Sequence, residues 1–257
     1  MTEHLTVLKE EAVESLVSNP SGLYVDCTFG RGGHTRHLLD QLSPDAKVMA
    51  FDRDEAAEQS AKDLTDNRFE FVRGAFSLFG EETRRRGLEG KFDGILMDLG
   101  VSSPQLDTPE RGFSFRFDAP LDMRMDTSQG QTAAEWLNTA EESDIPYVLR
   151  TYGEERFAKR IAREIVARQE TAPLSTTGEL VEICERCVPQ RQKEKKHRAT
   201  RTFQAVRIHI NEELKELETV LEDSLMALKP GGRLVVISFH SLEDRIVKHF
   251  IRKHSKP

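Results

Sequence analysis

Short apolar runs, each bounded by turn residues, recur through the N-terminal part of the chain. They are Leu23 to Cys27, Lys47 to Phe51, Phe69 to Arg73 and Gly94 to Asp98. The segments between them are polar or amphipathic and long enough for crossover helices, and residues 5–18 also carry apolar positions at helical spacing. Strands that alternate with helices predict a parallel sheet with right-handed crossovers, an α/β fold of the Rossmann-like kind.

The middle of the chain lacks this alternation. From Leu106 to Arg201 we find helical patterns and irregular stretches punctuated by proline and glycine, with no convincing strand. Apolar positions from Phe203 to Leu228 then predict one long amphipathic helix, followed by a turn and a fifth strand at residues 233–238. The sequence therefore predicts a sheet domain of residues 1–105 and 202–257, interrupted by a mostly helical domain of residues 106–201.

Composition narrows the class of protein. The 257 residues are 37% hydrophobic and 32% charged, enough to bury a core, and the net charge of -7 argues against coating nucleic acid through bulk charge. No apolar run approaches the ~20 residues that span a bilayer, and the N-terminus does not resemble a signal peptide, so we expect a cytoplasmic protein. Cys184 and Cys187 form a C-x-x-C pair without partners of zinc-site spacing. We therefore expect no metal and a half-buried pair on a helix.

A glycine-rich loop, Asp26-Cys27-Thr28-Phe29-Gly30-Arg31-Gly32-Gly33-His34-Thr35, directly follows the first strand. Glycines let the backbone turn tightly beside a ligand, and a helix that starts just beyond presents free N–H groups. Asp52 ends the second strand, where nucleotide-binding sheets place an acid that binds ribose hydroxyls. The third glycine of the dinucleotide motif is replaced by Thr35, and an acid four residues before Gly30 is typical of methyltransferases.

A second candidate site, Asp98-Leu99-Gly100-Val101-Ser102-Ser103-Pro104-Gln105, follows the fourth strand. Ligands of open parallel sheets bind beyond the carboxyl ends of the strands, near the point where the strand order reverses. Enzymes that methylate exocyclic amines commonly carry Asp or Asn here before a tight turn, although their usual Pro-Pro-aromatic sequence is absent. A strand-capping Asp in an Asx turn explains the same residues equally well, so position alone leaves both interpretations open.

Further motifs make the resemblance specific. They are Arg111 to Phe115, Pro120 to Met125, Tyr152 to Arg156, Ala199 to Ala205 and Ser238 to Arg245. Together with the glycine loop and the segment after Asp98, the chain resembles the bacterial RsmH (MraW) family from His4 almost to its end. Members of that family usually continue past the position of Pro257 through another strand and a basic tail, which this sequence does not contain.

This resemblance implies a class I methyltransferase that uses S-adenosyl-L-methionine to methylate the N4 amine of a cytidine in 16S ribosomal RNA. The cytidine then lies in the decoding region of the small ribosomal subunit. The resemblance involves no membrane, and it leaves open whether the protein forms a homodimer. The cofactor contacts that the resemblance implies are Gly32, Gly33, His34, Asp52, Phe76, Asp98 and Gln105. We hypothesise that Asp98 and the carbonyls after it accept the N–H bonds of the amine.

Two segments are hypothesised to bind RNA, because a base amine is reached only in a single-stranded or flipped nucleotide. In the first, arginines alternate with phenylalanines, a mixture suited to stacking and phosphate contact. Its candidates are Arg111, Phe113, Phe115, Arg116 and Arg124. In the second, residues 186–201, cations far outnumber acids, and its candidates are Lys195, Lys196, Arg198 and Arg201. Phenylalanines that anchor a loop, and a solvated charged face, are the structural alternatives.

Other functions fit the sequence less well. A nicotinamide-dependent reductase is disfavoured by Thr35 and by the lack of a Tyr-x-x-x-Lys motif. A non-catalytic RNA-binding or cofactor-sensing module would keep the glycine loop and the basic segment but would not need Asp98. Methylation of a protein or of a small molecule is disfavoured by the positive charge of the insert.

Overall fold

The computed structural model describes residues 6–190 and 196–255 and divides the chain into two compact units. The sheet unit comprises residues 1–100 and 214–257, and the helical unit comprises residues 101–213. The sequence placed these boundaries after residues 105 and 201. The second structural boundary falls later because helix α10 (Thr200–Ile210) packs on α7 (Asp144–Gly153) within the helical unit.

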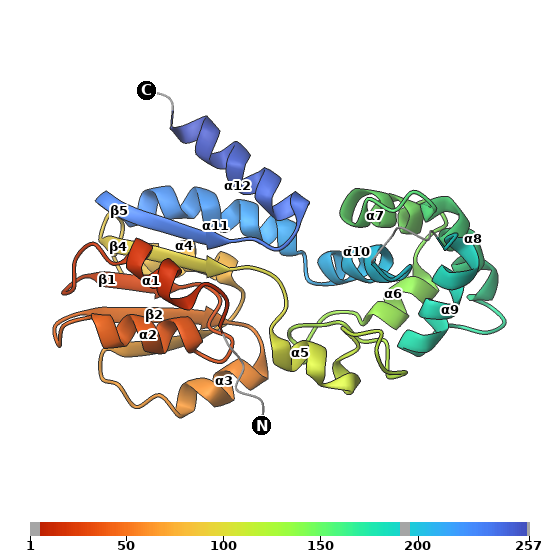
Figure 1. Cartoon of the computed structure of the whole chain (residues 1–257), viewed down its shortest axis with the longest axis horizontal. Helices are drawn as coiled ribbons and strands as arrows, with labels where there is room; N and C mark the ends of the chain where they lie inside the picture. The colour runs from red at the N-terminus through yellow and green to blue at the C-terminus, as the bar shows by residue number, and fades with distance from the viewer. Residues whose placement is uncertain (1–5, 191–195, 256–257) are drawn as a thin grey trace. The chain divides into compact units, whose positions relative to one another are not determined.

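The sheet unit is built on five parallel strands in the order β3-β2-β1-β4-β5 (Figure 1). These strands are β1 (Leu23–Asp26), β2 (Lys47–Asp52), β3 (Phe69–Arg73), β4 (Phe92–Asp98) and β5 (Leu228–Ile237). The order reverses between β1 and β4, because the chain builds outward from β1 in one direction before it returns to β4. The predicted Rossmann-like α/β architecture is confirmed, and the reversal places the ends of β1 and β4 side by side.

Alternate residues of the strands serve two cores, one on each face of the sheet. Tyr24 and Leu96 pack with α1 (Lys9–Leu16) and α2 (Gly33–Gln41) on one face. Val25 and Ile95 pack on the other face, against α4 (Phe79–Arg85) and α11 (Glu213–Ala227). Helix α3 (Glu55–Lys62) packs on β2 and β3 through a smaller cluster, and α12 (Ser241–His254) follows β5. Burial on both faces explains why the strands read as continuous apolar runs.

The helical unit has its own hydrophobic core. Its helices are α5 (Ser103–Asp107), the 3-10 turn η2 (Pro109–Arg111), α6 (Ala133–Thr139), α7, α8 (Ala158–Arg168), α9 (Thr177–Cys187) and α10. Ile161 and Ile165 of α8 are buried in this core. Cys184 and Cys187 lie on a helix as predicted, but they are free thiols buried in this core rather than half-buried.

The long helix predicted from Phe203 to Leu228 is wrong, because the structure has two helices there, α10 and α11. Between them Glu212 adopts a left-handed backbone with φ of 50°, and the Asn211 side chain bonds the loop of the helical unit. Its amide nitrogen donates to the Met123 carbonyl at 2.8 Å, and its oxygen accepts the Met125 N–H at 2.7 Å. An unbroken apolar period cannot reveal such a break, since the period continues across it.

The start of β5 also differs from the prediction. Leu228 already pairs with Phe92, and Arg233 pairs with Gly94, so residues 229–232 form an irregularity inside the strand rather than a turn before it. Lys229 forms an ion pair with Asp93 at this point. Among residues 6–190 and 196–255, no helix combines the length and the apolar character needed to span a membrane.

Candidate active site

The carboxyl ends of β1 and β4 are joined by one threonine. Thr28 Oγ1 accepts the backbone N–H of Asp98 at 2.7 Å and lies 3.4 Å from Asp26 Oδ1, to which it donates. The glycine loop and the segment after β4 are therefore held together by hydrogen bonds as well as by strand pairing. The two motifs that sequence separates by about seventy residues thus form one site at the reversal point.

The glycine loop takes backbone conformations that suit glycine. Gly30 and Gly32 have φ of 55° and 74°, and Gly32 caps α2 in the left-handed conformation. A Cβ on Gly32 would also strike the ring of Phe29, which is buried between Phe69 and Phe71 at centroid distances of 5.4 Å. Both the backbone angle and the packing therefore require glycine at this position.

Gly33 serves a different purpose. A Cβ there would collide with the hydroxyl of Thr6, so the missing side chain makes room for the segment before α1. The carbonyl of Val7 in the same segment lies 3.0 Å from His34 Nε2. Residues 6–7 therefore pack against Gly33 and His34 at the start of α2.

Asp26 organises the turn from inside the protein. Its buried carboxylate accepts hydrogen bonds from the Thr28 N–H at 3.0 Å and from the Thr35 hydroxyl at 2.7 Å. Thr35, which replaces the third glycine of the dinucleotide motif, thereby ties α2 to the end of β1. The departure from that motif has a structural role in this chain.

Asp52 braces the loop from the neighbouring strand. Its two carboxylate oxygens accept the N–H groups of Gly30 at 2.8 Å and of Asp54 at 2.9 Å. Burial raises the pKa of Asp52 to about 6, although both backbone hydrogen bonds act to lower it. The carboxyl thus lies between the glycine loop and the end of β2, where a ribose-binding acid is expected.

Asp98 lies among other acids. Burial, followed by the charges of Asp26 and Glu243, raises the pKa of Asp98 to about 7. One of its oxygens, Oδ1, is buried and has no hydrogen-bond partner in the described part of the chain. A buried polar atom without a partner is costly and is found where a ligand completes the bonding.

His34 faces the other oxygen of Asp98, with Nδ1 and Oδ2 3.7 Å apart. The Val7 carbonyl can only accept, so Nε2 of His34 carries a hydrogen and Nδ1 of the neutral ring carries none. Two acceptors then face each other across this gap.

The start of α12 supplies the third acid. Glu243 is 2% exposed and accepts the N–H groups of Phe239 at 2.8 Å and His240 at 3.2 Å, which completes a capping box. Burial acts to raise the pKa of Glu243, but the His240 ring, with Nε2 3.0 Å away, and these two backbone bonds together hold it below its usual value. Phe239 is 57% exposed and lies beside Gly100, so an aromatic face borders the turn after Asp98.

Phe76 begins the short helix η1 (Phe76–Leu78) and packs, partly buried, against the core of the sheet unit. Glu216 of α11 accepts the N–H of the next residue, Ser77, at 3.3 Å, and pairs with Arg53 at 3.1 Å. Arg53 directly follows Asp52. Glu216 therefore ties together the two loops that carry Asp52 and Phe76.

Several residues predicted to bind RNA have internal partners in the helical unit. Arg111 donates to the carbonyls of Arg124 and Met125, both at 3.0 Å, and its guanidinium lies 5.6 Å from the ring centre of Phe113. Phe113 is buried in the core, and Arg124 pairs with Asp122 at 2.8 Å. These three side chains shape the loop through residues 111–125.

The two predicted RNA segments nevertheless meet. The Phe115 ring stacks on His197 at 4.9 Å, while Arg116 and Lys196 are exposed on the respective segments. Arg198 donates to the carbonyl of Glu185 at 2.6 Å and pairs with its carboxylate. Arg201 lies half-buried in α10, and Lys195 lies outside the described residues.

Gln105, the remaining predicted cofactor contact, belongs to the helical unit. It is buried, and its side-chain oxygen accepts the Ser102 N–H at 2.9 Å in the capping box of α5. The Gln105 side chain thus fixes the start of α5, where the segment that follows Asp98 becomes helical.

Comparison with known proteins identifies the family. The model of the MraW methylase family matches residues 1–257. The chain belongs to this family. The family resemblance inferred from the motifs is therefore confirmed, and the sites described above are those of an MraW methylase family member.

Comparison with solved structures gives more distant matches. PH0851 is 16% identical with a TM-score of 0.46, and the match covers 96% of this chain and 37% of that one. NSun6 from Pyrococcus horikoshii, solved with SFG, is 14% identical with a TM-score of 0.44 and coverages of 97% and 41%. A putative rRNA-methylase from Clostridium thermocellum is 20% identical with a TM-score of 0.30 and coverages of 42% and 60%. This chain thus spans less than two thirds of each of these proteins.

The sequence did not single out three residues of this site, namely Thr28, Glu216 and Glu243. For Glu243 a signal exists, because an N-cap residue followed three positions later by Glu is the pattern of a capping box. Thr28 lies inside the glycine motif, but its bond to Asp98 depends on the pairing of β1 with β4. Glu216 has no local signal, since its partners are far away in the sequence.

The raised pKa of Asp98 predicts a pH-dependent stability. An acid whose pKa is higher in the folded state stabilises the fold while it is protonated, and this contribution is lost as the pH rises through about 7. Asp98→Asn should therefore stabilise the unliganded protein at pH 8 by a few kcal/mol, with about 4 kcal/mol as the upper bound. The gain should shrink towards pH 5, as measured by urea unfolding at both pH values. An equal or absent gain at both pH values would contradict the raised pKa.

Proposed function

We propose that this chain is an S-adenosyl-L-methionine-dependent methyltransferase that methylates the N4 amine of a cytidine in 16S ribosomal RNA. Membership of the MraW methylase family supports methyl transfer. The observation that carries the proposal is Asp98, whose buried Oδ1 lacks a partner in the described part of the chain and lies at the reversal point of the sheet, next to the glycine loop. The sheet unit would hold the cofactor, and the helical unit would recognise the substrate.

The residues of the site fit this cofactor. Asp26, Asp98 and Glu243 place acidic groups around the end of β4, and such a site suits a positively charged sulfonium. We assign the binding of the cofactor to Gly32, Gly33, His34, Asp52, Phe76, Asp98 and Gln105. When bound, the cofactor supplies an electrophilic methyl group.

The protein's own part is to orient the amine and to accept its hydrogens. The lone pair of a cytosine amine is delocalised into the ring, which makes the amine a poor nucleophile. An acceptor for its N–H bonds favours a tetrahedral nitrogen with an available lone pair. The ionised carboxylate of Asp98 and the backbone carbonyls after it are the acceptors in this proposal, and positioning of this kind contributes ~7–11 kcal/mol to catalysis.

The test uses small ribosomal subunits from a strain that lacks the modification. Incubation with the protein and methyl-labelled cofactor, followed by digestion to nucleosides, should yield labelled N4-methylcytidine. Label in another nucleoside would reject the N4 assignment, and label in the protein fraction alone would reject RNA as the substrate. Cofactor binding without any transfer would favour a non-catalytic module. With a ribosomal substrate, the proposal also includes a cytoplasmic location of the protein.

Loss of the Glu216 bridge should weaken cofactor binding. In Glu216→Ala the loops after β2 and β3 lose their shared anchor, and we expect the dissociation constant for S-adenosylhomocysteine to rise about tenfold. A hydrogen bond to a charged group such as Glu216 contributes about 1.5–3 kcal/mol. We expect part of this free energy to be lost from cofactor binding, because the loops must then be ordered by the ligand. Calorimetry measures the affinity, and Glu218→Ala on the same helix serves as the control. Equal affinities of both variants would show that the bridge does not position the site.

A further inference from the structure

The outward side of α8 and the turn just before it carry a row of cations. Arg156, Lys159, Arg160 and Arg163 follow one another at intervals of three, one and three residues, which is the spacing of one face of a helix. All four are exposed, whereas Ile161, Ala162 and Ile165 on the opposite side are buried in the core. We call these four residues the α8 cationic face.

None of these four side chains makes an ion pair or a hydrogen bond with another residue in the ranges 6–190 and 196–255. This distinguishes them from three paired arginines of the helical unit. Arg168 of the same helix pairs with Glu179, Arg186 pairs with Glu164, and Arg198 pairs with Glu185. The acid on the outward side of α8, Glu164, is therefore itself paired with Arg186.

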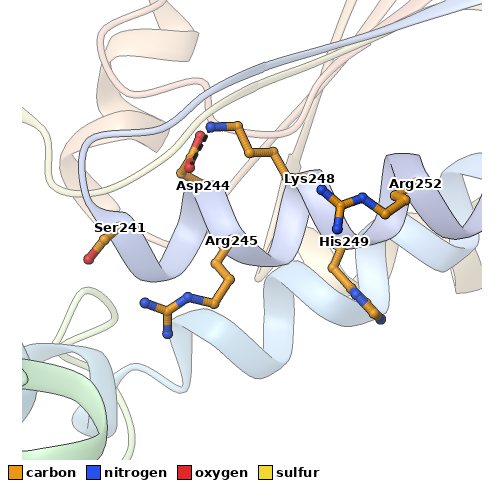
Figure 2. Close-up of a pocket in the computed structure, with 6 residues that line it drawn as sticks. All are labelled: Ser241, Asp244, Arg245, Lys248, His249 and Arg252. Atoms are coloured by element: carbon orange, nitrogen blue, oxygen red, sulfur yellow. Dashed lines mark hydrogen bonds and ion pairs between the residues drawn. The ribbon is translucent and has the colours of Figure 1, made fainter.

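A second basic surface is more strongly neutralised. The outer side of α12 lines a groove of about 350 Å³ and carries Arg245, Lys248 and Arg252, as Figure 2 shows. Lys248 pairs with Asp244 within this groove at 2.9 Å, and Lys253 of the same helix pairs with Glu222. By contrast, no cation of the α8 cationic face forms such an ion pair within the described part of the chain.

We infer that the α8 cationic face binds the phosphate backbone of the RNA substrate. Four cations without a partner in the described part of the chain, on a protein with a net charge of -7, are not explained by general solubility. Residues 156–163 extend over roughly 10 Å along the helix, so the face is long enough for several cations to act on a single strand. This surface rests on the proposed function, which supplies RNA as the partner.

The test is the triple variant Lys159→Ala, Arg160→Ala, Arg163→Ala. Alanine keeps the helix, and the buried side of α8 is untouched. Affinity for a ribosomal RNA fragment that contains the decoding region should fall at least tenfold. The slope of log affinity against log salt should become shallower by about two, because each lost phosphate contact removes about 0.7–0.9.

The matched control is Lys62→Ala, Arg85→Ala, Lys91→Ala, which removes the same charge from exposed positions of the sheet unit. It should leave RNA affinity nearly unchanged. Both variants should bind S-adenosylhomocysteine as the unchanged protein does, which verifies the sheet unit, and circular dichroism verifies the helices. If the triple variant loses helicity, the single variants Lys159→Ala and Arg163→Ala should each make the salt slope shallower by nearly one.

The possible outcomes distinguish a failure of the α8 cationic face as an RNA-binding surface from a failure of the proposed function. If the unchanged protein methylates RNA and the triple variant binds it with the same affinity and salt slope, the surface is wrong and the function stands. If the unchanged protein neither binds nor methylates RNA, the proposed function fails and the surface fails with it. A loss confined to assembled subunits, with unchanged binding to free RNA, would assign the face to a protein partner and overturn the inference.

Discussion

Replacing Asp98 by alanine is expected to reduce the rate of methyl transfer by about 10²–10³, the effect of removing one preorganised group from a reaction centre. The structure supports so large an effect because Oδ1 of Asp98 is buried without a partner among the described residues, while Thr28 fixes the backbone of the same residue. Asp98→Asn keeps the shape and loses the charge, so its loss should be smaller. Single-turnover rates with saturating cofactor measure both.

The pH profile distinguishes a chemical role of Asp98 from a structural one. Only the ionised carboxylate accepts at both oxygens, and its pKa is raised to about 7 by burial and by the charges of Asp26 and Glu243. The rate should therefore fall as the pH drops through the pKa of Asp98 in the complex, which the positive sulfonium lowers from this value, approaching a tenfold loss for each pH unit, and the profile of Asp98→Asn should lack this step.

Cofactor affinity must be measured in the same variants, because Asp98 is also a predicted cofactor contact. The exposed Asp63→Asn on the sheet unit is the control and should change neither rate nor pH profile. Rates of Asp98→Ala within threefold of the unchanged protein, at full occupancy of the cofactor, would remove Asp98 from the reaction.

Much of the sheet unit follows from local sequence. Strands buried on both faces produce apolar runs such as Lys47 to Phe51, and their boundaries differ from the structural ones by only a few residues at β1 to β4. Glycines at positive φ and the acids that end β1, β2 and β4 are local features as well. Because the carboxyl ends of parallel strands meet at one edge of the sheet, Asp98 and the glycine loop could be predicted to share that edge, whereas their direct contact depends on the pairing of β1 with β4.

The parts that could not be predicted depend on distant partners. Asn211 ends α10 through bonds to Met123 and Met125, which no helical period contains. Arg111 and Arg124 look like free cations in the sequence, yet they bind carbonyls and Asp122. The spacing of cations therefore indicates charge, whereas only the structure shows which charges are already compensated, as it does for α8.

Gly32→Ala is expected to have the second largest effect, on stability and on cofactor binding together. A left-handed residue other than glycine costs about 1–2 kcal/mol, and overpacking adds about 1–3 kcal/mol. The second cost applies because Phe29, which the new Cβ would strike, is buried and packs against the rings of Phe69 and Phe71. We expect the free energy of unfolding to fall by about 2–5 kcal/mol, as measured in urea.

Cofactor affinity should fall further than stability suggests. The N–H of Gly30 bonds Asp52, so a displaced turn also moves the acid that is expected to bind ribose. We expect at least a hundredfold loss of S-adenosylhomocysteine affinity under conditions where the variant is folded, since small misplacements in a positioned site have effects of this size.

Gly87→Ala separates the two causes. Gly87 also has a left-handed backbone, with φ of 65°, but a Cβ there would meet nothing within 4 Å. This variant should lose only the conformational cost and should bind S-adenosylhomocysteine normally. If Gly32→Ala were no less stable than Gly87→Ala and bound the ligand equally well, the packing of Phe29 would not constrain the loop. The glycine would then be required only for its backbone angle, and the loop would have room to adjust.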